Sequence, residues 1–339
     1  MAEYKDFIPE NIAPLNAKRI GVHNSAGRRL GYIPLGSLTP PNPSQKLYSA
    51  GIGSDIHVTY TTGESDFKNA LVYWNAEKVA FICISGDLAT VGADDQLSKV
   101  KNLIDTYSPN TPVYVSGGNH DAYDADWNLR PEAEVSASLQ KWTGNPLYYS
   151  FEYGVDVYIF VGICQDTFSV SELQWLYETL ERYRNRRCFL FQHAFYFGGS
   201  GNAFGLYTYD LLSGTRGKVF LSLLRHYHNV IWCHGHSHTK FHGQEFNAMA
   251  NIDKVLGCWS VHVPSTAIPR TDADGDFEFQ IEYQDSEAYV MDVYPNGIHL
   301  RGIDLVNRQF LPIASYWLDT TLQTIPAGTY TDSTGTIVT

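Results

Sequence analysis

The chain alternates short apolar runs with longer segments in which apolar residues recur every three or four positions. The short runs have the length of buried strands and cover residues 79–87, 112–121, 155–164, 187–193 and 229–236. The longer segments have a helical period, and they predict helices over 66–78, 95–107, 169–183 and 219–228. The helix at 169–183 opens with Ser169 and Glu172, which match a capping box. Strands that alternate with helices predict an α/β core.

Both ends of the chain differ from this alternating pattern. Residues 19–36 read as a hairpin, and the proline-rich stretch 37–45 reads as a linker. The last residues, 326–339, are small and polar and predict a loose tail. We therefore expect an N-terminal arm at 1–47, one catalytic domain at 48–325 and a C-terminal tail. The arm is also a candidate for contacts that build an oligomer.

Charge narrows the classes of function. The chain has 339 residues, enough for one large domain or two small ones. Its 24 basic and 36 acidic residues give a formal net charge of −12, which disfavours a general nucleic-acid-binding surface. A small anionic ligand stays compatible with this charge, because bound cations reverse the potential inside a site.

The cysteines and the hydropathy pattern indicate the compartment. The five cysteines form no CxxC pair, and most lie in apolar strand-like runs, so we expect buried reduced thiols. The first residues lack a basic region followed by an apolar stretch, and no apolar run approaches the length of a membrane span. We expect no signal peptide, no contact with a membrane and a cytoplasmic location.

Polar residues gather where the predicted strands end, which is where open α/β sheets bind ligands. The motifs are "SDIH" at 54–57, "GD" at 86–87, "GGNHD" at 117–121, "QH" at 192–193 and "GHSH" at 235–238. One such motif is weak evidence: "HYH" at 226–228 has the same His-x-His spacing, and it fits the C-terminus of a helix. The ordered set of carboxylates, an amide and imidazoles favours a metal site.

The stretch "CHGHSH" at 233–238 continues a predicted strand. In an extended segment its three histidines would share one face, whereas a bend at the intervening glycine would direct His236 and His238 toward two nearby points. The alternative is a histidine cluster that is solvated or satisfied in the core. His234 lies before the bend, and we expect it to be buried or to support the ligands.

The ordered set resembles the calcineurin-like metallophosphoesterase superfamily over roughly residues 48–312. The resemblance implies a four-layer α/β/β/α sandwich of two mixed sheets with helices outside. It also implies two divalent transition-metal ions (Mn, Fe or Zn) and hydrolysis of a small phosphorylated substrate by a metal-activated hydroxide. One ion would take Asp55, His57, Asp87 and His238, and the other would take Asp87, Asn119, His193 and His236. Asp87 would bridge the two ions.

Three further residues are candidates for the reaction. His120 follows Asn119 directly, and an imidazole suits protonation of a leaving oxygen, with Asp121 as the group that orients it. The alternative for His120 is a supporting hydrogen bond without proton transfer. Arg270 is a candidate for binding a phosphate oxygen, although a solvated surface arginine explains it as well.

The second motif departs from two branches of the superfamily. It reads "GDLATV", with Thr90 where serine/threonine phosphatases have an aspartate and purple acid phosphatases have a metal-binding tyrosine. What remains resembles the phosphodiesterase-type branch, so we expect a phosphodiesterase. The alternatives are a phosphomonoesterase on the same centre, or a structural or binding protein, such as a phage or surface component, that uses the fold.

Overall fold

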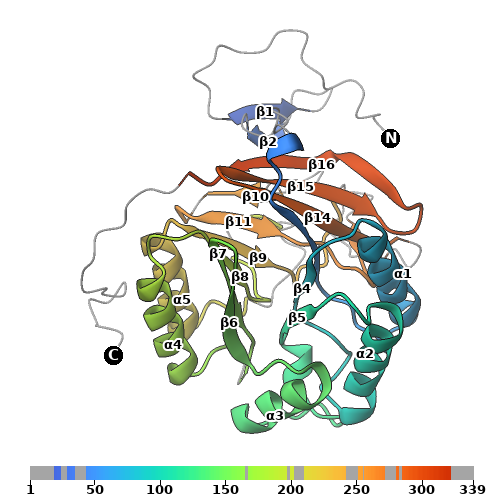
Figure 1. Ribbon diagram of the computed structural model, residues 1–339. Coiled ribbons are helices and arrows are strands. Elements are labelled where there is room, and N and C mark those ends of the chain that lie inside the picture. Colours follow the sequence, from blue (N-terminus) through green and yellow to red (C-terminus); the bar gives the residue numbers. More distant parts are fainter. Residues whose placement is uncertain are drawn as a thin grey trace.

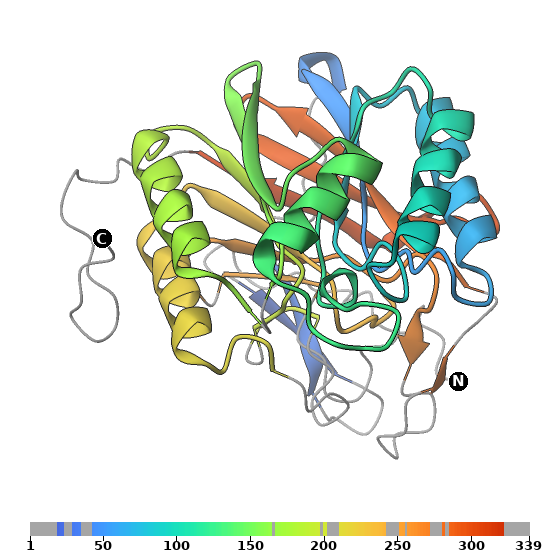
Figure 2. The same ribbon diagram turned by 90° about the horizontal axis from the view of Figure 1, so that it is seen from below.

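The computed structural model describes most of the chain between residues 43 and 321, together with two strands before it. The described residues are 19–23, 29–34, 43–164, 167–196, 199–201, 210–241, 251–254, 256–271, 280–281 and 285–321. Two facing sheets form the centre of the domain, and a group of helices covers each outer side (Figures 1 and 2). The predicted four-layer sandwich is confirmed.

The strands of the two sheets follow each other along the chain as β3 Tyr48–Gly53, β4 Phe81–Ser85, β5 Val113–Ser116, β6 Tyr148–Tyr153, β7 Asp156–Val161, β8 Cys188–Phe191, β9 Val230–His234, β10 Ile252–Asp253, β11 Trp259–His262, β14 Glu287–Tyr294, β15 Gly297–Asp304 and β16 Gln309–Asp319. The first sheet has the order β10-β11-β9-β8-β7-β6, and its four central strands are parallel. The second has the order β16-β15-β14-β3-β4-β5, in which β3, β4 and β5 are parallel. Both sheets are therefore mixed.

In the part of the chain that the structure describes, five α-helices and two short 3₁₀ turns connect the strands. They are α1 Gly63–Ala76, α2 Asp94–Tyr107, α3 Glu132–Thr143, α4 Val170–Arg182 and α5 Thr215–His226, with η3 Pro43–Gln45 and η4 His120–Ala122. Helix α4 begins with the predicted capping box, because Glu172 N donates to Ser169 Oγ and Ser169 N donates to Glu172 Oε2.

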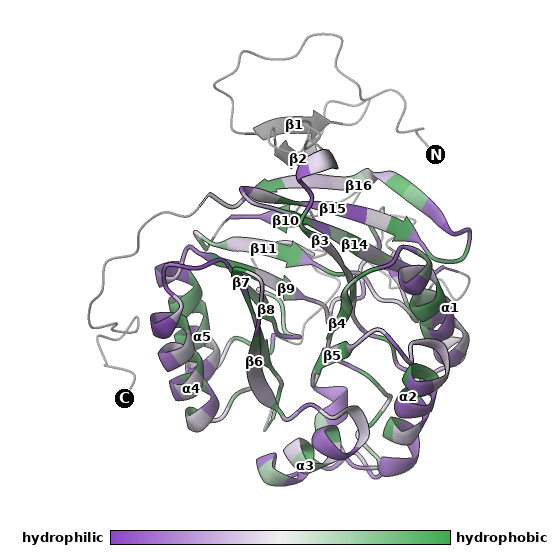
Figure 3. Cartoon of the chain, viewed as in Figure 1, coloured by the Kyte–Doolittle hydropathy of each residue, from purple (hydrophilic) through white to green (hydrophobic). Residues whose placement is uncertain are grey.

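Apolar side chains fill three spaces between these layers. One cluster joins α4 and α5 to the first sheet and includes Phe220 and Trp232. A second joins α1, α2 and α3 to the other sheet and includes Trp74. The third lies between the sheets and includes Phe160 and Met291. Figure 3 shows the hydrophobic residues along the central strands and hydrophilic ones on the outward faces of the helices. This packing fixes the two sheets against each other.

The predicted elements compare closely with the observed ones. All five predicted strands and all four predicted helices are present, and their ends agree within three residues, except that β5 ends five residues before its predicted end and α5 begins four residues before its predicted start. Helix α3 was not predicted, and its N-terminal position carries a proline and no capping side chain. The predicted hairpin is present as β1 Arg19–His23 paired antiparallel with β2 Arg29–Pro34. A second small pair joins β12 Arg270–Thr271 to β13 Gln280–Ile281.

Other predictions about the chain have mixed outcomes. All five cysteines are buried and free, as expected. In the described part of the chain, every helix is too short or too polar to cross a membrane. The linker up to residue 42 and the tail at 326–339 lie outside the described residues. The proposed domain boundaries therefore stay a prediction.

Candidate metal centre

The predicted ligands come from the carboxyl ends of five strands in two sheets. Asp55 follows β3, Asp87 follows β4 and Asn119 follows β5, while His193 follows β8 and His236 follows β9. Because β3, β4 and β5 are neighbours in one sheet and β8 and β9 are neighbours in the other, their ends meet at one shared edge. His57 and His238 lie two residues beyond Asp55 and His236.

The first group of ligand atoms belongs to Asp55, His57, Asp87 and His238. These atoms all lie within 4.8 Å of one another, and all four residues are buried. His238 Nε2 is 3.0 Å from Asp55 Oδ1, and His57 Nε2 is 3.5 Å from Asp87 Oδ2. The two imidazole nitrogens, His57 Nε2 and His238 Nε2, are 3.4 Å apart. The structure thus assembles the set that the resemblance implied for one ion.

The second group shares Asp87 with the first. Its ligand atoms belong to Asp87, His193 and His236 and also lie within 4.8 Å of one another. His193 Nε2 is 3.0 Å from Asp87 Oδ2, and His236 Nδ1 is 3.2 Å from His193 Nε2. Among the described residues, these two groups are the clusters of carboxylates and imidazoles close enough to hold a metal ion, and both contain Asp87.

The backbone at the ligands is strained. Eight non-glycine residues in the described part of the chain have a positive φ, between 32° and 70°. Five of the eight are ligand candidates, namely Asp55, His57, Asp87, His236 and His238. Each such residue costs about 1–3 kcal/mol, and outliers of this kind cluster at functional sites. The bend expected within "CHGHSH" is therefore present, and His236 and His238 are both in the left-handed region.

Two glycines allow the ligand loops to approach closely. A Cβ atom on Gly118 would lie 2.0 Å from Asp87 Oδ1, and one on Gly235 would lie 1.9 Å from Ser54 Oγ and 2.3 Å from Asp55 Oδ2. Any side chain at either position would displace a ligand loop. The glycines of the "GGNHD" and "GHSH" motifs thus serve the packing of the loops.

Backbone carbonyls set the orientation of two ligand imidazoles. His193 Nδ1 is 2.7 Å from Ser85 O, and His238 Nδ1 is 3.0 Å from Ile268 O. A carbonyl only accepts, so each Nδ1 carries a proton, and Nε2 is the nitrogen that faces the cluster. Sequence reasoning missed both carbonyls, because a main-chain oxygen has no residue-type signature.

The donor atoms fit a cation. Asn119 Oδ1 is buried and accepts no hydrogen bond from a described residue, while the buried Asp87 Oδ2 has the imidazole of His193 3.0 Å away. Buried oxygens without a hydrogen-bond partner are rare, and they are costly unless an ion or water satisfies them. Asn119 was predicted to join the second group, and its orphaned oxygen supports that position. Carboxylate, amide and imidazole donors suit Mn, Fe or Zn.

The protonation of the site reflects burial and mutual charge. Burial lowers the pKa of His57 and of His236 to about 3, so both are neutral at ordinary pH. Burial also lowers the pKa of His193, but the carboxylates of Asp87 and Asp55 outweigh it and raise that pKa to about 9. For Asp87, burial raises the pKa, whereas His193 and the other histidines outweigh burial and hold the pKa well below its ordinary range.

His120 lies beside the cluster, but Asp121 does not orient it. His120 Nδ1 is 2.8 Å from Thr90 O, so this carbonyl holds the ring. The carboxylate of Asp121 instead accepts from the backbone N–H groups of Leu88, Ala89 and Gly118. The expected orientation of His120 by Asp121 was wrong: Asp121 braces the loop that carries Asp87. The chain turns into η4 at His120, and this turn directs the two side chains apart.

The structure also places Arg270 and His234, the two remaining residues that the sequence singled out. The backbone of Arg270 is fixed to the ligand loop, because Arg270 N donates to His238 O at 2.8 Å. His234 is buried at the end of β9, and its Nε2 lies 3.1 Å from both Ser200 Oγ and Ser260 Oγ. His234 belongs to neither ligand group, as expected for a residue before the bend.

The fold and the site define a class of protein that holds metal ions at the shared edge of two sheets. Residues 51–240 match the calcineurin-like phosphoesterase family, and the chain belongs to this family. Its described residues include two groups of carboxylates and imidazoles that could hold metal ions, as the resemblance implied. No curated protein matches the chain.

Solved structures share the fold at low sequence identity. The purple acid phosphatase PPD1 from yellow lupin (Lupinus luteus) is 15% identical with a TM-score of 0.57, and the match covers 89% of this chain and 59% of that one. The present chain thus matches less than two thirds of that phosphatase. GAP50, described as the anchor in the inner membrane complex of Plasmodium, is 15% identical with a TM-score of 0.49, over 83% of this chain and 90% of that one.

Proposed function

We propose that the protein is a two-metal phosphoric ester hydrolase that prefers phosphodiesters. The observation that carries the proposal is the pair of ligand groups joined at Asp87. When bound, two divalent ions polarise a phosphoryl oxygen and lower the pKa of a water molecule. Asp55, His57, Asp87 and His238 would hold one ion, and Asp87, Asn119, His193 and His236 would hold the other.

The residues of this chain prepare the site for an anionic phosphate ester. Asn119 contributes a neutral oxygen, which limits the negative charge that the substrate meets. The imidazoles of His57 and His236 are neutral, as their pKa of about 3 indicates. A metal ion therefore has no proton to displace from either ring. Arg270 lies next to the His238 loop, and we propose that it binds a phosphate oxygen.

His120 is the proposed general acid. Its Nδ1–H donates to Thr90 O, so Nε2 is the nitrogen that is left to protonate the leaving oxygen. The ring lies 4.8 Å from that of the ligand His57, centre to centre. The carbonyl oxygen of Thr90 thus supports the general-acid role of His120 by holding its ring. Separately, the threonine side chain at position 90 is the reason for preferring the phosphodiesterase-type branch.

A comparison of leaving groups tests the role of His120. A poor leaving group such as an alkoxide needs the proton, whereas a nitrophenolate leaves without it. His120→Asn should lower kcat by about 10²–10⁴-fold on an alkyl or nucleoside diester and much less on a nitrophenyl diester, with unchanged metal content. His193→Asn, which removes a ligand, should impair both substrates alike. Equal losses on both substrates for His120→Asn would eliminate the general-acid role.

A substrate panel with metal analysis tests the function as a whole. Diesters and monoesters are offered with Mn²⁺, Zn²⁺ and Fe²⁺, and the proposal expects about two ions per chain and faster hydrolysis of diesters. Faster hydrolysis of monoesters would make the protein a phosphomonoesterase on the same centre. Less than about one ion per chain, together with no hydrolysis, would favour a structural or binding role. The cytoplasmic location and an oligomer built through the N-terminal arm stay predictions.

A further inference from the structure

Trp127 contacts the proposed general acid from outside the metal cluster. Its ring lies 5.5 Å from that of His120, centre to centre, and the two planes meet at 77°. His120 in turn makes an edge contact with the ligand His57. One imidazole therefore separates the indole from the first metal site. Tyr123 packs against the same indole at 5.7 Å.

The exposure of Trp127 is unusual for its residue type. All seven tryptophans of the chain lie in the described part, and Trp127 alone among them is classed as exposed, at 53% of its surface. Tryptophan side chains bury 150–250 Å² when they pack, so leaving half of one in water forgoes much of that stabilisation. Stability of the fold does not explain this position.

The backbone at Trp127 is strained as well. Its φ is 62°, in the left-handed region that bulky side chains avoid. The surrounding loop enforces this conformation: Trp127 N donates to Asp124 O, and Asp124 Oδ1 accepts from Asn128 N at 2.9 Å. Strain of this kind persists where the neighbouring structure over-determines it, typically at ligand clamps and active sites.

The loop that carries Trp127 is tied to the metal loops. Arg130 Nη2 donates to Asp121 O at 2.7 Å, and Arg130 N donates to Ala122 O. Gly92 N donates to Tyr123 O, which joins the loop to the segment that follows Asp87. The indole is thus presented beside His120 by a braced loop, with part of its surface open to solvent.

From these contacts we propose that Trp127 is a specificity-determining residue that stacks on a flat aromatic ring in the leaving group of the substrate, such as a nucleobase or an aryl ring. The inference rests on the proposed function, because His120 would protonate the leaving oxygen and so defines the side on which the leaving group lies. Trp127 contacts His120 and is half exposed, which makes it the aromatic ring that a group departing beside His120 would meet.

Binding of two phosphonates tests the platform without any turnover. Phenylphosphonate and methylphosphonate carry the same charged group and differ in the ring. On the metal-loaded full chain, calorimetry should show tighter binding of phenylphosphonate, and Trp127→Ala should weaken it by about five- to a hundredfold, as for other base–aromatic stacks. Methylphosphonate should bind equally to both proteins. Trp127→Phe should retain most of the preference.

Two variants separate stacking from structural effects. Leu129→Ala removes another exposed apolar side chain, 40% exposed, from the same loop and should change neither phosphonate affinity. Trp127→Asn tolerates the left-handed backbone, so it should fold at least as stably as the natural chain while losing the phenyl preference. A loss of phenyl preference in Leu129→Ala, or its retention in both Trp127→Ala and Trp127→Asn, would overturn the proposal.

Kinetics distinguish a platform from a support for His120. Stacking predicts that Trp127→Ala raises KM for an ester with an aryl leaving group and leaves kcat nearly unchanged. A fall of kcat on aryl and methyl esters alike would show that Trp127 only holds His120, and the inference would fail while the proposed function stood. If the natural chain hydrolysed no ester yet preferred phenylphosphonate through Trp127, the proposed function would fail and the aromatic site would remain as a binding site.

Discussion

Two His-x-His stretches lie at opposite ends of β9, and they differ in almost every physical respect. At the carboxyl end, His236 and His238 are buried, have positive φ and belong to the two metal-ligand groups. At the amino end, His226 closes α5, and His228 Nε2 lies 2.8 Å from the carbonyl of Arg225. Identical spacing thus produces a ligand pair in one place and a helix end in the other.

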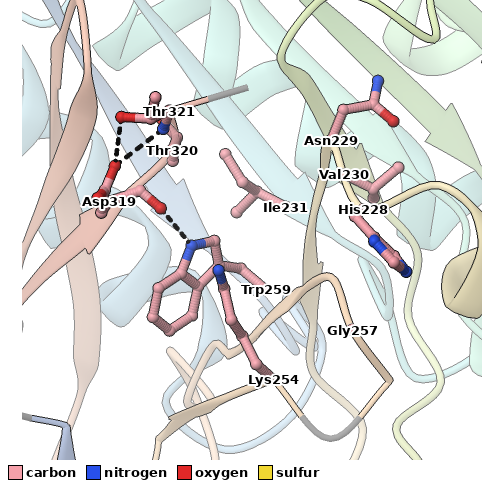
Figure 4. A pocket seen from close by; sticks show the side chains of 10 residues that line it. All are labelled: His228, Asn229, Val230, Ile231, Lys254, Gly257, Trp259, Asp319, Thr320 and Thr321. Carbon is pink, nitrogen blue, oxygen red and sulfur yellow. Dashed lines mark hydrogen bonds between the residues drawn. The ribbon is translucent and has the colours of Figure 1, made fainter. Parts of the chain in front are cut away.

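The amino end of β9 borders the pocket of Figure 4, which has a volume of about 90 Å³. Its walls include Lys254, whose Nζ lies 4.3 Å from the centre of the Trp259 ring, and Asp319, whose carbonyl accepts from Trp259 Nε1. Both groups contact Trp259. Among the described residues that line it there is no cluster of convergent carboxylates and imidazoles, and neither metal-ligand group includes one of them.

The buried charges at the amino ends of the strands, here called the amino edge, are also fully paired. Arg187 donates to both carboxylate oxygens of Asp156, at 2.8 and 2.7 Å, and its remaining nitrogen donates to Tyr294 O and to Thr320 Oγ1. Tyr48 Oη donates to the same carboxylate. A charge satisfied in this way joins the two sheets. At the carboxyl edge, by contrast, carboxylates and imidazoles converge on one another, an arrangement suited to holding a cation.

The largest effect should come from Asp87, the residue on which the comparison depends most. Asp87→Ala should remove both ions and lower hydrolysis by about 10³-fold or more, because the ions supply several kcal/mol of transition-state stabilisation. Metal analysis and the rate on a diester measure this. His238→Ala should reduce mainly the first ion and His236→Ala mainly the second. Two ions at full occupancy in Asp87→Ala would disprove the shared-carboxylate assignment.

At the amino edge the expected loss is in stability alone. Arg187→Ala leaves the carboxylate of Asp156 buried without its opposite charge, which typically costs about 3–5 kcal/mol of unfolding free energy. Denaturant unfolding measures it, and the folded variant should still bind two ions. The control is Arg186→Ala, whose partner Glu152 is half exposed, and it should cost no more than about 1 kcal/mol. Loss of metal from folded Arg187→Ala would break the contrast between the two edges.

The pH dependence of metal binding sharpens the contrast further. With a pKa of about 9, His193 carries a proton at pH 7 in the metal-free protein, and an ion must displace it. Affinity of the second site should therefore rise about tenfold per pH unit up to about pH 9. Calorimetry in buffers of different ionisation enthalpy should detect about one proton released per ion bound there. His193→Asn should abolish this release.

The same proton affects the stability of the metal-free protein. The folded pKa of His193 lies above its unfolded value of about 6.5, so its contribution is fully present below pH 6.5 and is lost as the pH rises through about 9. His57 and His236 stay neutral in this window, because their pKa is about 3. A melting temperature that rises from pH 6.5 to 9 without metal would contradict the assignment.

The smallest effect should be at the histidine that only resembles a ligand. His228→Asn should change stability by no more than about 0.5 kcal/mol and leave both ions and the activity unchanged, because the side chain is exposed and makes one local hydrogen bond. Its matched partner is His236→Asn, which should lose most of the second ion. A similar loss of metal in both variants would mean that the spacing of the histidines, and not their place in the fold, decides the binding.

The sequence by itself determined the types and order of the candidate ligands. Each ligand follows a local run of apolar residues that forms a strand, and a glycine or serine nearby permits the turn that comes next. These relations involve few neighbouring residues, so local pattern is sufficient to find them. The capping box at Ser169 and Glu172 is local for the same reason, and it is present in the structure.

Only the tertiary structure decided how the ligands meet and what their neighbours do. Asp87 and His193 are more than a hundred residues apart, and the apolar layer between the two sheets brings their atoms to 3.0 Å. The carbonyls of Ser85 and Ile268 orient the imidazoles, while Asp121 braces a loop instead of His120. These contacts depend on the packing of distant strands and on main-chain atoms that every residue type shares. Residue identity along the chain therefore gives no local signal of them.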